Sequence, residues 1–341
     1  MRYTISTILA SLLATGAALA EVPKVVTDFA PTYGLVSMVM GDLGQPEILL
    51  DKGANAHEFQ LKPSQSASLQ EAGLVIWVGP RMSPWLERVL DSFGSVPQLR
   101  LLEVKGAHLQ EFGSEAAHDH GGDDHEGHGH EGHDHEAHTK AGHDHEGHDH
   151  AEEGHEGHSH EGHEGHSHEG IDPHAWLDPA NGAVWLEAIA AELSRLDPEN
   201  AATYAANAEK AKALIAETDA KIAAQLKPVQ GKPFVVFHDA YGYFAAHYGL
   251  KVAGSVALGD ATSPGAAHLR ALQDKAGAEA LCLFPEAGHD GKLVEQMAEA
   301  TGVKLGAALD PEGAALERDA QIYPALLQGL ATTLTDCLTQ N

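Results

Sequence analysis

The chain has 341 residues, 43% of them hydrophobic, and a formal net charge of −29. This length is enough for two domains of ordinary size. The acidity argues against nucleic acid or an anionic membrane as a partner, because both are themselves negatively charged. More than half of the negative charge comes from one segment, residues 113–170, which has 17 acidic residues and one lysine.

The N-terminus predicts export from the cytoplasm. Met1 and Arg2 precede an apolar run from Ile5 to Leu19 that ends in small residues. This pattern is typical of a secretory signal peptide, which we place at residues 1–20 with cleavage near Ala20. The cleavage point has no cysteine to carry a lipid. We therefore expect a soluble protein of the periplasm.

The first lobe, residues 21–178, alternates strands and helices. The predicted strands cover residues 25–27, 47–50, 74–78 and 99–103. The predicted helices cover residues 31–40, 64–72 and 85–93, with Pro31 in the first turn of one and Ser64 as the N-cap of another. Such alternation indicates a parallel sheet covered by helices.

A connecting region, residues 179–230, follows. It begins with a predicted helix over residues 184–193. Asp197, Pro198 and Glu199 then supply an N-cap, a first-turn proline and a first-turn acid. The next glycine-free and proline-free stretch predicts one helix over residues 198–226, on the order of 43 Å long. A helix of that length can span two lobes.

The second lobe, residues 231–341, repeats the alternation. Its predicted strands cover residues 234–237, 252–256, 281–284 and 303–306. Its predicted helices cover residues 241–248, 292–300 and 320–338, and a further helix follows a Thr262–Ser263 cap with Pro264 in its first turn. The chain is thus expected to be an α/β protein of two lobes with parallel sheets covered by helices.

Histidine, acid and glycine make up most of residues 113–170. Without apolar side chains this insert cannot offset the entropy of an ordered chain, so we expect it to be disordered. Mobile neutral imidazoles suit zinc, copper, nickel and iron, which makes weak metal binding more plausible than a simple polar linker. The histidines of this low-affinity loop are His118, His120, His125, His128, His130, His133, His135, His138, His143, His145, His148, His150, His155, His158, His160, His163, His166 and His168.

Two cysteines occur, Cys282 and Cys337. An exported chain meets an oxidising compartment, so we expect one disulfide, with two free buried thiols as the alternative. Closing a loop of that size would stabilise the fold by about 4 kcal/mol in the chain-entropy account.

Outside the insert, three histidines and one aspartate fall at positions where ligands bind in α/β folds. His57 follows the strand ending at Leu50, His238 directly follows the strand at residues 234–237, and Asp310 follows the last strand. The carboxyl ends of parallel strands are the usual ligand-binding edge. His174 lies just before the connecting region. Each alone could be a structural residue, but together they suggest a zinc site, which needs three or four converging donors.

Further residues are assigned around this constellation. Asp239 and Asp178 are candidates to accept hydrogen bonds from the imidazoles, although Asp178 fits better as the N-cap of the next helix. The remaining histidines are expected at the surface, on a helix or in a turn, away from a metal. They are His108, His268, His247 and His289.

Four segments in combination resemble the zinc-specific receptors of bacterial ATP-binding-cassette importers, the ZnuA type. They are NAHEFQLKPS around His57, LVIWVGP, DPHAWLDP around His174, and FHDAYGYFAAHYGL beginning at Phe237. The resemblance runs from about Val25 to Leu338. It implies two lobes joined by one rigid helix, with the metal held in the cleft between them by His57, His174 and His238.

The resemblance leaves the fourth donor open. Some zinc members have a metal-bound glutamate directly before the first histidine, where this chain has Ala56. Manganese relatives use an aspartate at the place of Asp310, so the choice lies between Asp310 and water. The resemblance also implies a Cys282–Cys337 pair, and an inner-membrane ABC permease and a periplasmic zinc chaperone as partners of a monomer.

Three imidazoles favour zinc over manganese, which prefers oxygen donors, but do not exclude copper, nickel or cobalt. Zinc is therefore the expected transported ligand, and its affinity should fall as the pH drops through about 6.5. A zinc hydrolase is a rival reading, but HExxH is absent and Glu58 is the only candidate base. A stand-alone periplasmic zinc buffer is the other rival. We expect a receptor and no enzyme.

Overall fold

The computed structural model describes residues 22–57, 59–113, 170–257 and 264–340. The predicted signal peptide, the eighteen histidines of the insert, Glu58, Thr262 and Ser263 lie outside these residues. The helix predicted to have Pro264 in its first turn instead begins at Ala266 with Gly265 as its N-cap, so that prediction is wrong. Among the described helices, none combines the length and the apolar content that crossing a bilayer would require.

The first lobe is built on a four-stranded parallel sheet in the order β2-β1-β3-β4. Its strands are β1 (Val25–Thr27), β2 (Glu47–Ile48), β3 (Leu74–Trp77) and β4 (Gln98–Arg100). Its helices are α1 (Ala30–Met40), α2 (Pro63–Gln70) and α3 (Pro84–Phe93). The strand at 47–50 is shorter than predicted, although Leu49 and Leu50 continue to donate to the backbone of β1 and its following residue.

The start of α2 differs from the prediction. The N-cap is Lys62 and not Ser64, because Pro63 occupies the first turn, where its missing N–H is not needed. The Gln65 side chain accepts a hydrogen bond from Lys62 N at 2.7 Å, which gives this backbone N–H a partner at the start of the helix.

The second lobe has the same architecture, with a parallel sheet in the order β6-β5-β7-β8. Its strands are β5 (Pro233–His238), β6 (Lys251–Ala257), β7 (Cys282–Leu283) and β8 (Lys304–Leu305). Its helices are α6 (Gly242–Tyr248), α7 (Ala266–Glu279), α8 (Lys292–Thr301) and α9 (Ile322–Leu338). The predicted disulfide is confirmed and ties Cys282 of β7 to Cys337 of α9.

In the sequence, two helices follow the first sheet and precede the second: α4 (Pro179–Leu196) and α5 (Ala201–Leu226). Asp178 caps α4 by accepting from Ala180 N at 2.8 Å, as expected. Asp197 does not cap α5, because a single 3-10 turn, Pro198–Asn200, comes first. Its buried carboxylate instead accepts from the Asn200 side chain and the Tyr204 hydroxyl.

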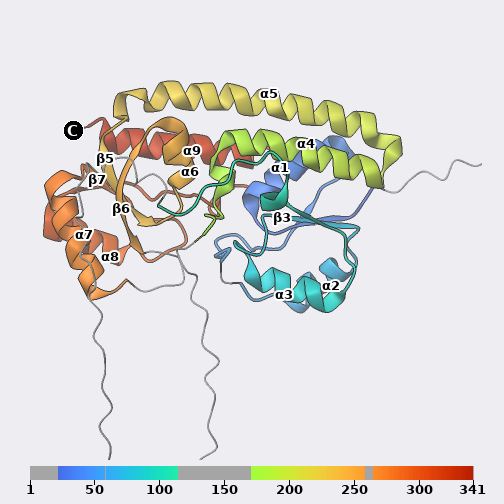
Figure 1. Ribbon diagram of the computed structural model, residues 1–341, viewed down its shortest axis with the longest axis horizontal. Helices are drawn as coiled ribbons and strands as arrows, with labels where there is room; N and C mark the ends of the chain where they lie inside the picture. Colours follow the sequence, from blue (N-terminus) through green and yellow to red (C-terminus); the bar gives the residue numbers. More distant parts are fainter. Residues whose placement is uncertain (1–21, 58, 114–169, 258–263, 341) are drawn as a thin grey trace, which may run out of the picture.

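Helix α5 packs along α4, α1 and α9, and Figure 1 shows it running over both lobes. Its buried side chains recur every three or four residues, which places them on one face of the helix. They are Tyr204, Ala208, Ala211, Ile215, Thr218, Ile222 and Leu226. Apolar residues of this face belong to a hydrophobic core that extends from β1 to the end of α9. The helices α1, α4, α5 and α9 therefore form a shared layer behind both sheets.

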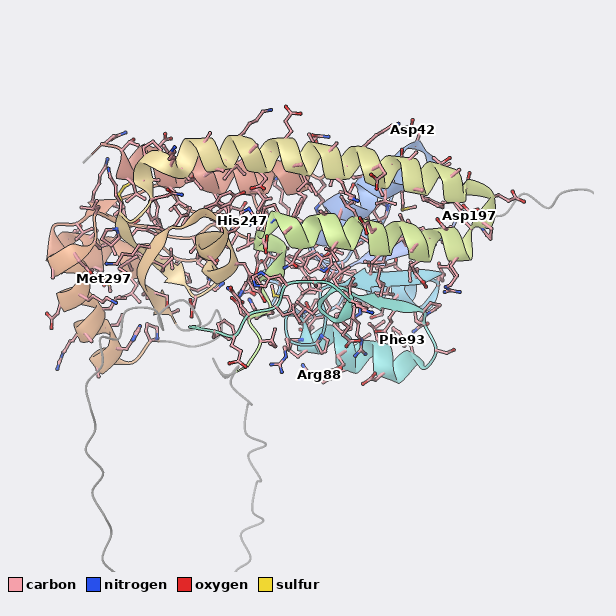
Figure 2. All side chains as sticks on the ribbon, turned by 45° about the horizontal axis from the view of Figure 1, so that its top comes forward. Asp42, Arg88, Phe93, Asp197, His247 and Met297 are labelled. Carbon is pink, nitrogen blue, oxygen red and sulfur yellow. A yellow bond between two sulfur atoms is a disulfide. The ribbon has the colours of Figure 1, made fainter. Side chains whose placement is uncertain are left out.

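A charged contact attaches α6 to α4 and α5. The His247 ring, seen near the middle of the molecule in Figure 2, lies 3.3 Å from Asp178 and 2.9 Å from Asp219 of α5. The hydrogen bond with Asp178 raises the pKa of His247, against an opposing effect of burial, and Asp219 raises it further. Burial alone would raise the pKa of Asp178, but hydrogen bonds from His247, His108 and Ala180 N lower it.

We predict that this contact stabilises the metal-free protein most at mildly acidic pH. Because folding raises the pKa of His247, its contribution is complete below about pH 6.5 and is lost as the pH rises through the folded-state pKa. His247→Gln should therefore lower the free energy of unfolding more at about pH 6 than at about pH 9. Urea denaturation at both pH values measures the difference.

The matched control is His268→Gln, since Nε2 of the His268 ring is hydrogen-bonded, at 2.9 Å, to the backbone carbonyl of Ser255 and not to a carboxylate. A destabilisation by His247→Gln that is the same at both pH values would contradict the charged contact.

Candidate functional site

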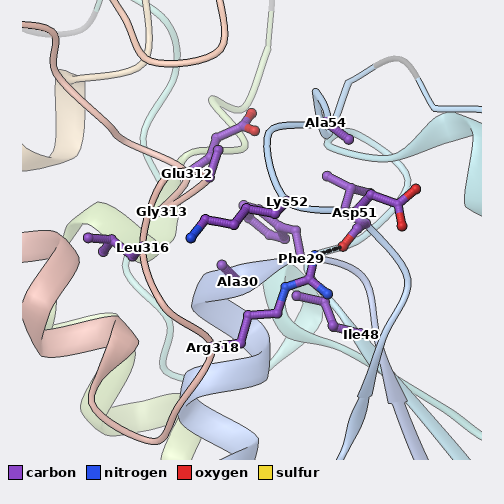
Figure 3. Close-up of a pocket in the computed structure, with 12 residues that line it drawn as sticks. Phe29, Ala30, Ile48, Asp51, Lys52, Ala54, Glu312, Gly313, Leu316 and Arg318 are labelled. Carbon is purple, nitrogen blue, oxygen red and sulfur yellow. Dashed lines mark hydrogen bonds between the residues drawn. The ribbon is translucent and has the colours of Figure 1, made fainter.

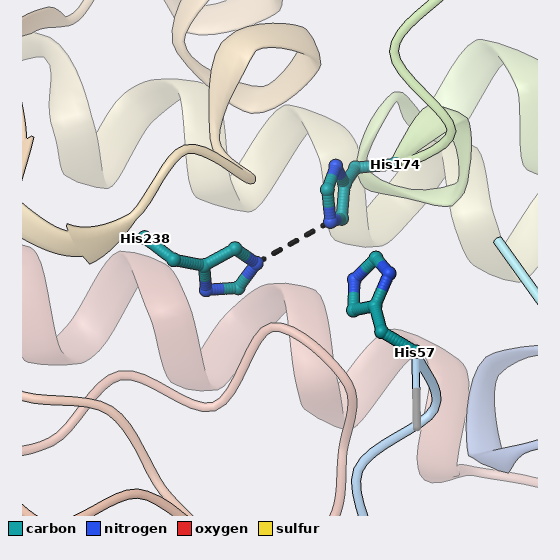
Figure 4. Close-up of side chains that lie close together, drawn as sticks. All are labelled: His57, His174 and His238. Atoms are coloured by element: carbon teal, nitrogen blue, oxygen red, sulfur yellow. Dashed lines mark hydrogen bonds between the residues drawn. The ribbon is translucent and has the colours of Figure 1, made fainter. Parts of the chain in front are cut away.

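Three histidines that are far apart in sequence meet between the two sheets. His57 lies in the loop after β2, His174 directly precedes a 3-10 helix, Ala175–Leu177, and His238 is the last residue of β5. One ring nitrogen from each lies within 4.8 Å of the others (Figure 4). His174 and His238 are buried and His57 is half-buried. Of the described residues, these three form the group that could hold a metal ion.

Buried carboxylates fix the orientation of two of these rings. Asp172 Oδ1 lies 2.6 Å from Nδ1 of His174, and Glu286 Oε2 lies 2.7 Å from Nδ1 of His238. A carboxylate facing Nδ1 favours the tautomer that carries its proton there, which leaves Nε2 as a lone-pair donor. Both Nε2 atoms are thus prepared as metal ligands.

The two Nε2 atoms face each other at 3.3 Å. Two lone pairs repel at this distance unless a proton or a cation lies between them. Zinc with Zn–N bonds of about 2.0–2.1 Å and tetrahedral angles holds its nitrogen ligands about 3.3–3.4 Å apart. The spacing of His174 and His238 therefore already fits a shared zinc ion, and His57 is near enough to complete the set.

Local sequence explains how these rings are placed. In the Asp172-Pro-His174 segment, Asp172 Oδ1 also accepts from the backbone N of His174 at 2.9 Å. His238 ends a central strand of the second sheet, and β7, which pairs with that strand, leads into Glu286. The Asn55 side chain accepts from His57 N at 2.7 Å and so orders the loop that carries the third ring.

The residue before His57 has a structural task. Ala56 is fully buried, and its carbonyl accepts a hydrogen bond from the Trp85 indole at 2.8 Å. Its backbone N lies 3.4 Å from Glu312 Oε2 on the loop before α9. The first-lobe loop is thereby attached to the second lobe next to the histidines.

Asp310 is placed differently from the three histidines. Its two carboxylate oxygens accept from the backbone N of Ala314 and Ala315, at 2.8 and 2.9 Å. It is absent from the group whose donor atoms converge. Its carboxylate organises the loop that carries Glu312.

The electrostatics of the site are dominated by burial. Burial raises the pKa of the Glu286 carboxyl well above its usual range, the hydrogen bond from Tyr241 opposes this, and the carboxylate of Asp310 adds to it. Burial lowers the pKa of His289, and a positive charge on His238, when that ring is protonated, acts in the same direction. The His289 ring lies 3.6 Å from Glu286, on the carboxyl oxygen that does not face His238.

The carboxylates that orient the rings differ from the candidates taken from the sequence. Glu286 faces Nδ1 of His238 and Asp172 faces Nδ1 of His174, and neither was among those candidates; Asp178 is engaged with His108 and His247. Asp172 could have been recognised in the sequence as a partner of His174, because it lies two residues before that histidine in the DPH segment. Glu286 could have been found from its position just beyond the strand next to β5, but only with the strand order known.

A small hollow lies near the site, between the loop after β2 and the loop before α9 (Figure 3). Glu312 lines it together with Lys52 and Arg318. Arg318 donates to Leu50 O at 2.6 Å and Lys52 pairs with Glu317 at 2.7 Å, so these contacts also connect the two loops. Its lining includes none of the three histidines.

The chain is similar to known proteins both in sequence and in fold. The family profile of ZnuA, zinc-uptake complex component A, periplasmic, matches residues 25–337. The high-affinity zinc uptake system protein ZnuA of Paracoccus denitrificans is 54% identical, over 98% of each chain, and that of Brucella suis is 42% identical, over 93% of this chain and 92% of its own. A crystal structure of ZnuA, 22% identical, has the same fold with a TM-score of 0.66, over 92% of this chain and 99% of its own. The chain belongs to the ZnuA family.

Proposed function

We propose that this protein is a periplasmic receptor that captures Zn²⁺ in the cleft between its lobes and delivers it to an inner-membrane ABC permease. The observation that supports this most is the pair of facing Nε2 atoms, each prepared by a carboxylate on the other side of its ring. Membership of the ZnuA family, and relatives named as high-affinity zinc uptake proteins, point to the same cargo.

The proposed ligands are His57, His174 and His238, with water in the fourth position. Water is preferred to Asp310 because both oxygens of that carboxylate already accept backbone hydrogen bonds. Three nitrogen donors suit zinc better than manganese, which prefers oxygen. Selection against copper and nickel then depends on which metal is available, because those ions bind nitrogen sites at least as strongly.

The family consists of solute-binding receptors and not of enzymes, which argues against the zinc hydrolase reading. A hydrolase would also need a general base beside a metal-bound water. Of the described carboxyls, Asp172 and Glu286 contact two of these rings, and both lie on the Nδ1 side, away from the Nε2 atoms that would hold the metal.

The other parts of the proposal concern delivery. The His-rich insert would collect further zinc weakly and pass it to the cleft, because neutral imidazoles next to carboxylates attract divalent cations. The receptor would act as a monomer, accept zinc from a periplasmic zinc chaperone and dock on the permease.

Zinc titration separates the cleft from the insert. We predict one tight site in the full chain and in a variant lacking residues 115–168, and its loss in both when His238→Ala is introduced, because that substitution removes one of the two prepared nitrogens. Calorimetry in competition with a chelator measures the tight site. Loss of tight binding on deletion of the insert, with retention in His238→Ala, would instead favour the zinc buffer.

Removing the carboxylates that orient the rings should weaken zinc binding without removing a ligand. Asp172→Ala and Glu286→Ala are each expected to lower zinc affinity by roughly 10- to 100-fold. Asp197→Ala is the matched control, because it removes a buried carboxylate that holds a tyrosine at the remote end of α4. Competition with a chromophoric chelator, on variants shown to be folded by circular dichroism, measures the change. Equal affinities in all three variants would show that the two carboxylates are not part of the site.

A further inference from the structure

The two ends of the chain that flank the His-rich insert lie side by side. Asp172 N donates to Gln110 O at 2.9 Å, Glu111 and Ile171 form an antiparallel bridge, and Phe112 N donates to Gly170 O at 3.2 Å. We call this paired segment, residues 110–112 and 170–172, the stem. It adjoins the site directly, because Asp172 holds the ring of His174.

Tyr243 of the second lobe contacts both strands of the stem. Its hydroxyl donates to Asp172 O at 2.9 Å and accepts from Gln110 N at 3.0 Å. The side chain is 1% exposed. Tyr243 belongs to α6, the helix that begins four residues after His238. One hydroxyl therefore connects the element that follows His238 to both strands of the segment that leads into His174.

The same helix approaches the stem closely at Gly242. A Cβ atom at this position would lie 2.6 Å from Gln110 Nε2 and 3.1 Å from Asp172 Oδ2. The absence of a side chain there lets α6 lie against the carboxylate that orients His174. The contact of Tyr243 is thus part of a close-fitting surface between the stem and the second lobe.

We propose that Tyr243 is a positioning residue of the metal site. By holding Asp172 through its carbonyl, it keeps the carboxylate of Asp172, and with it Nε2 of His174, in register with Nε2 of His238 before zinc enters. Two ligands on different lobes are then presented together, and less free energy is spent on aligning them when the ion binds. This inference rests on the proposed function, since it assumes that zinc binds at the three histidines.

The test compares Tyr243→Phe with Tyr204→Phe in the full chain. Both substitutions remove a buried hydroxyl that is hydrogen-bonded to an aspartate residue, but Tyr204 contacts Asp197, whose place in Figure 2 is at the far end of α4. Zinc affinity is measured by chelator competition. The Co²⁺ absorption spectrum reports the geometry of the ligands. Thermal unfolding without metal reports stability.

Tyr243→Phe should bind zinc roughly three- to tenfold more weakly, as expected for loss of one or two hydrogen bonds, and should change the Co²⁺ spectrum. Tyr204→Phe should lower the melting temperature to a similar degree and leave affinity and spectrum unchanged. Gly242→Ala, which crowds Asp172 without removing a hydrogen bond, should weaken zinc binding in the same direction and serves if Tyr243→Phe does not fold.

Zinc affinities of Tyr243→Phe and Gly242→Ala that equal that of Tyr204→Phe would overturn the positioning role. His238→Ala, measured alongside, keeps this result distinct from failure of the proposed function. If His238→Ala abolishes the tight site while Tyr243→Phe has no effect, only the positioning role is wrong. If His238→Ala retains the tight site, the proposed metal site itself is wrong.

Discussion

The site depends on two short hydrogen bonds on the far sides of two imidazole rings. Asp172 and Glu286 face the Nδ1 atoms of His174 and His238, and a carboxylate in this position favours the tautomer whose lone pair is on Nε2. The two Nε2 atoms then face each other at 3.3 Å. Two lone pairs at this distance repel unless a proton or a cation lies between them, so the pair is suited to share a metal ion.

Both halves of the site are supported by the same layer of helices. His174 precedes α4 and His238 ends β5, and behind them α1, α4, α5 and α9 share one hydrophobic core. Hydrogen bonds next to the histidines add to this support. Among them are the bond of Tyr243 to the stem and that of Trp176 Nε1 to Pro311 O at 2.7 Å. The rings are consequently held by many contacts that involve no ligand atom.

Much of this was accessible from the sequence. Strand and helix alternation predicted two parallel sheets, and placing histidines at the carboxyl ends of strands singled out His57 and His238, because that edge is where side chains from different loops converge. The limits of β2 and β7 were not predictable from their apolar runs, since only two residues of each take part in the ladder. The cap of α2 was missed because a proline next to a serine offers two plausible helix starts.

The carboxylates around the rings were harder to predict than the rings. Glu286 is 48 residues from His238, and only the pairing of β5 with β7 makes them neighbours. Asp310 follows a strand, as expected of a metal ligand, but the backbone N–H groups of Ala314 and Ala315 donate hydrogen bonds to its carboxylate. Sequence position thus indicates which residues reach the cleft, whereas hydrogen bonding decides which atoms remain available for a metal.

The most direct measurement is a crystal structure of the protein loaded with one equivalent of Zn²⁺, with anomalous diffraction collected on both sides of the zinc absorption edge. The account predicts one strong anomalous peak about 2.0–2.1 Å from a ring nitrogen of each of His57, His174 and His238, with Asp172 and Glu286 still on the Nδ1 atoms. A zinc ion bound elsewhere, or rings of His174 and His238 turned away from each other in the loaded protein, would contradict it.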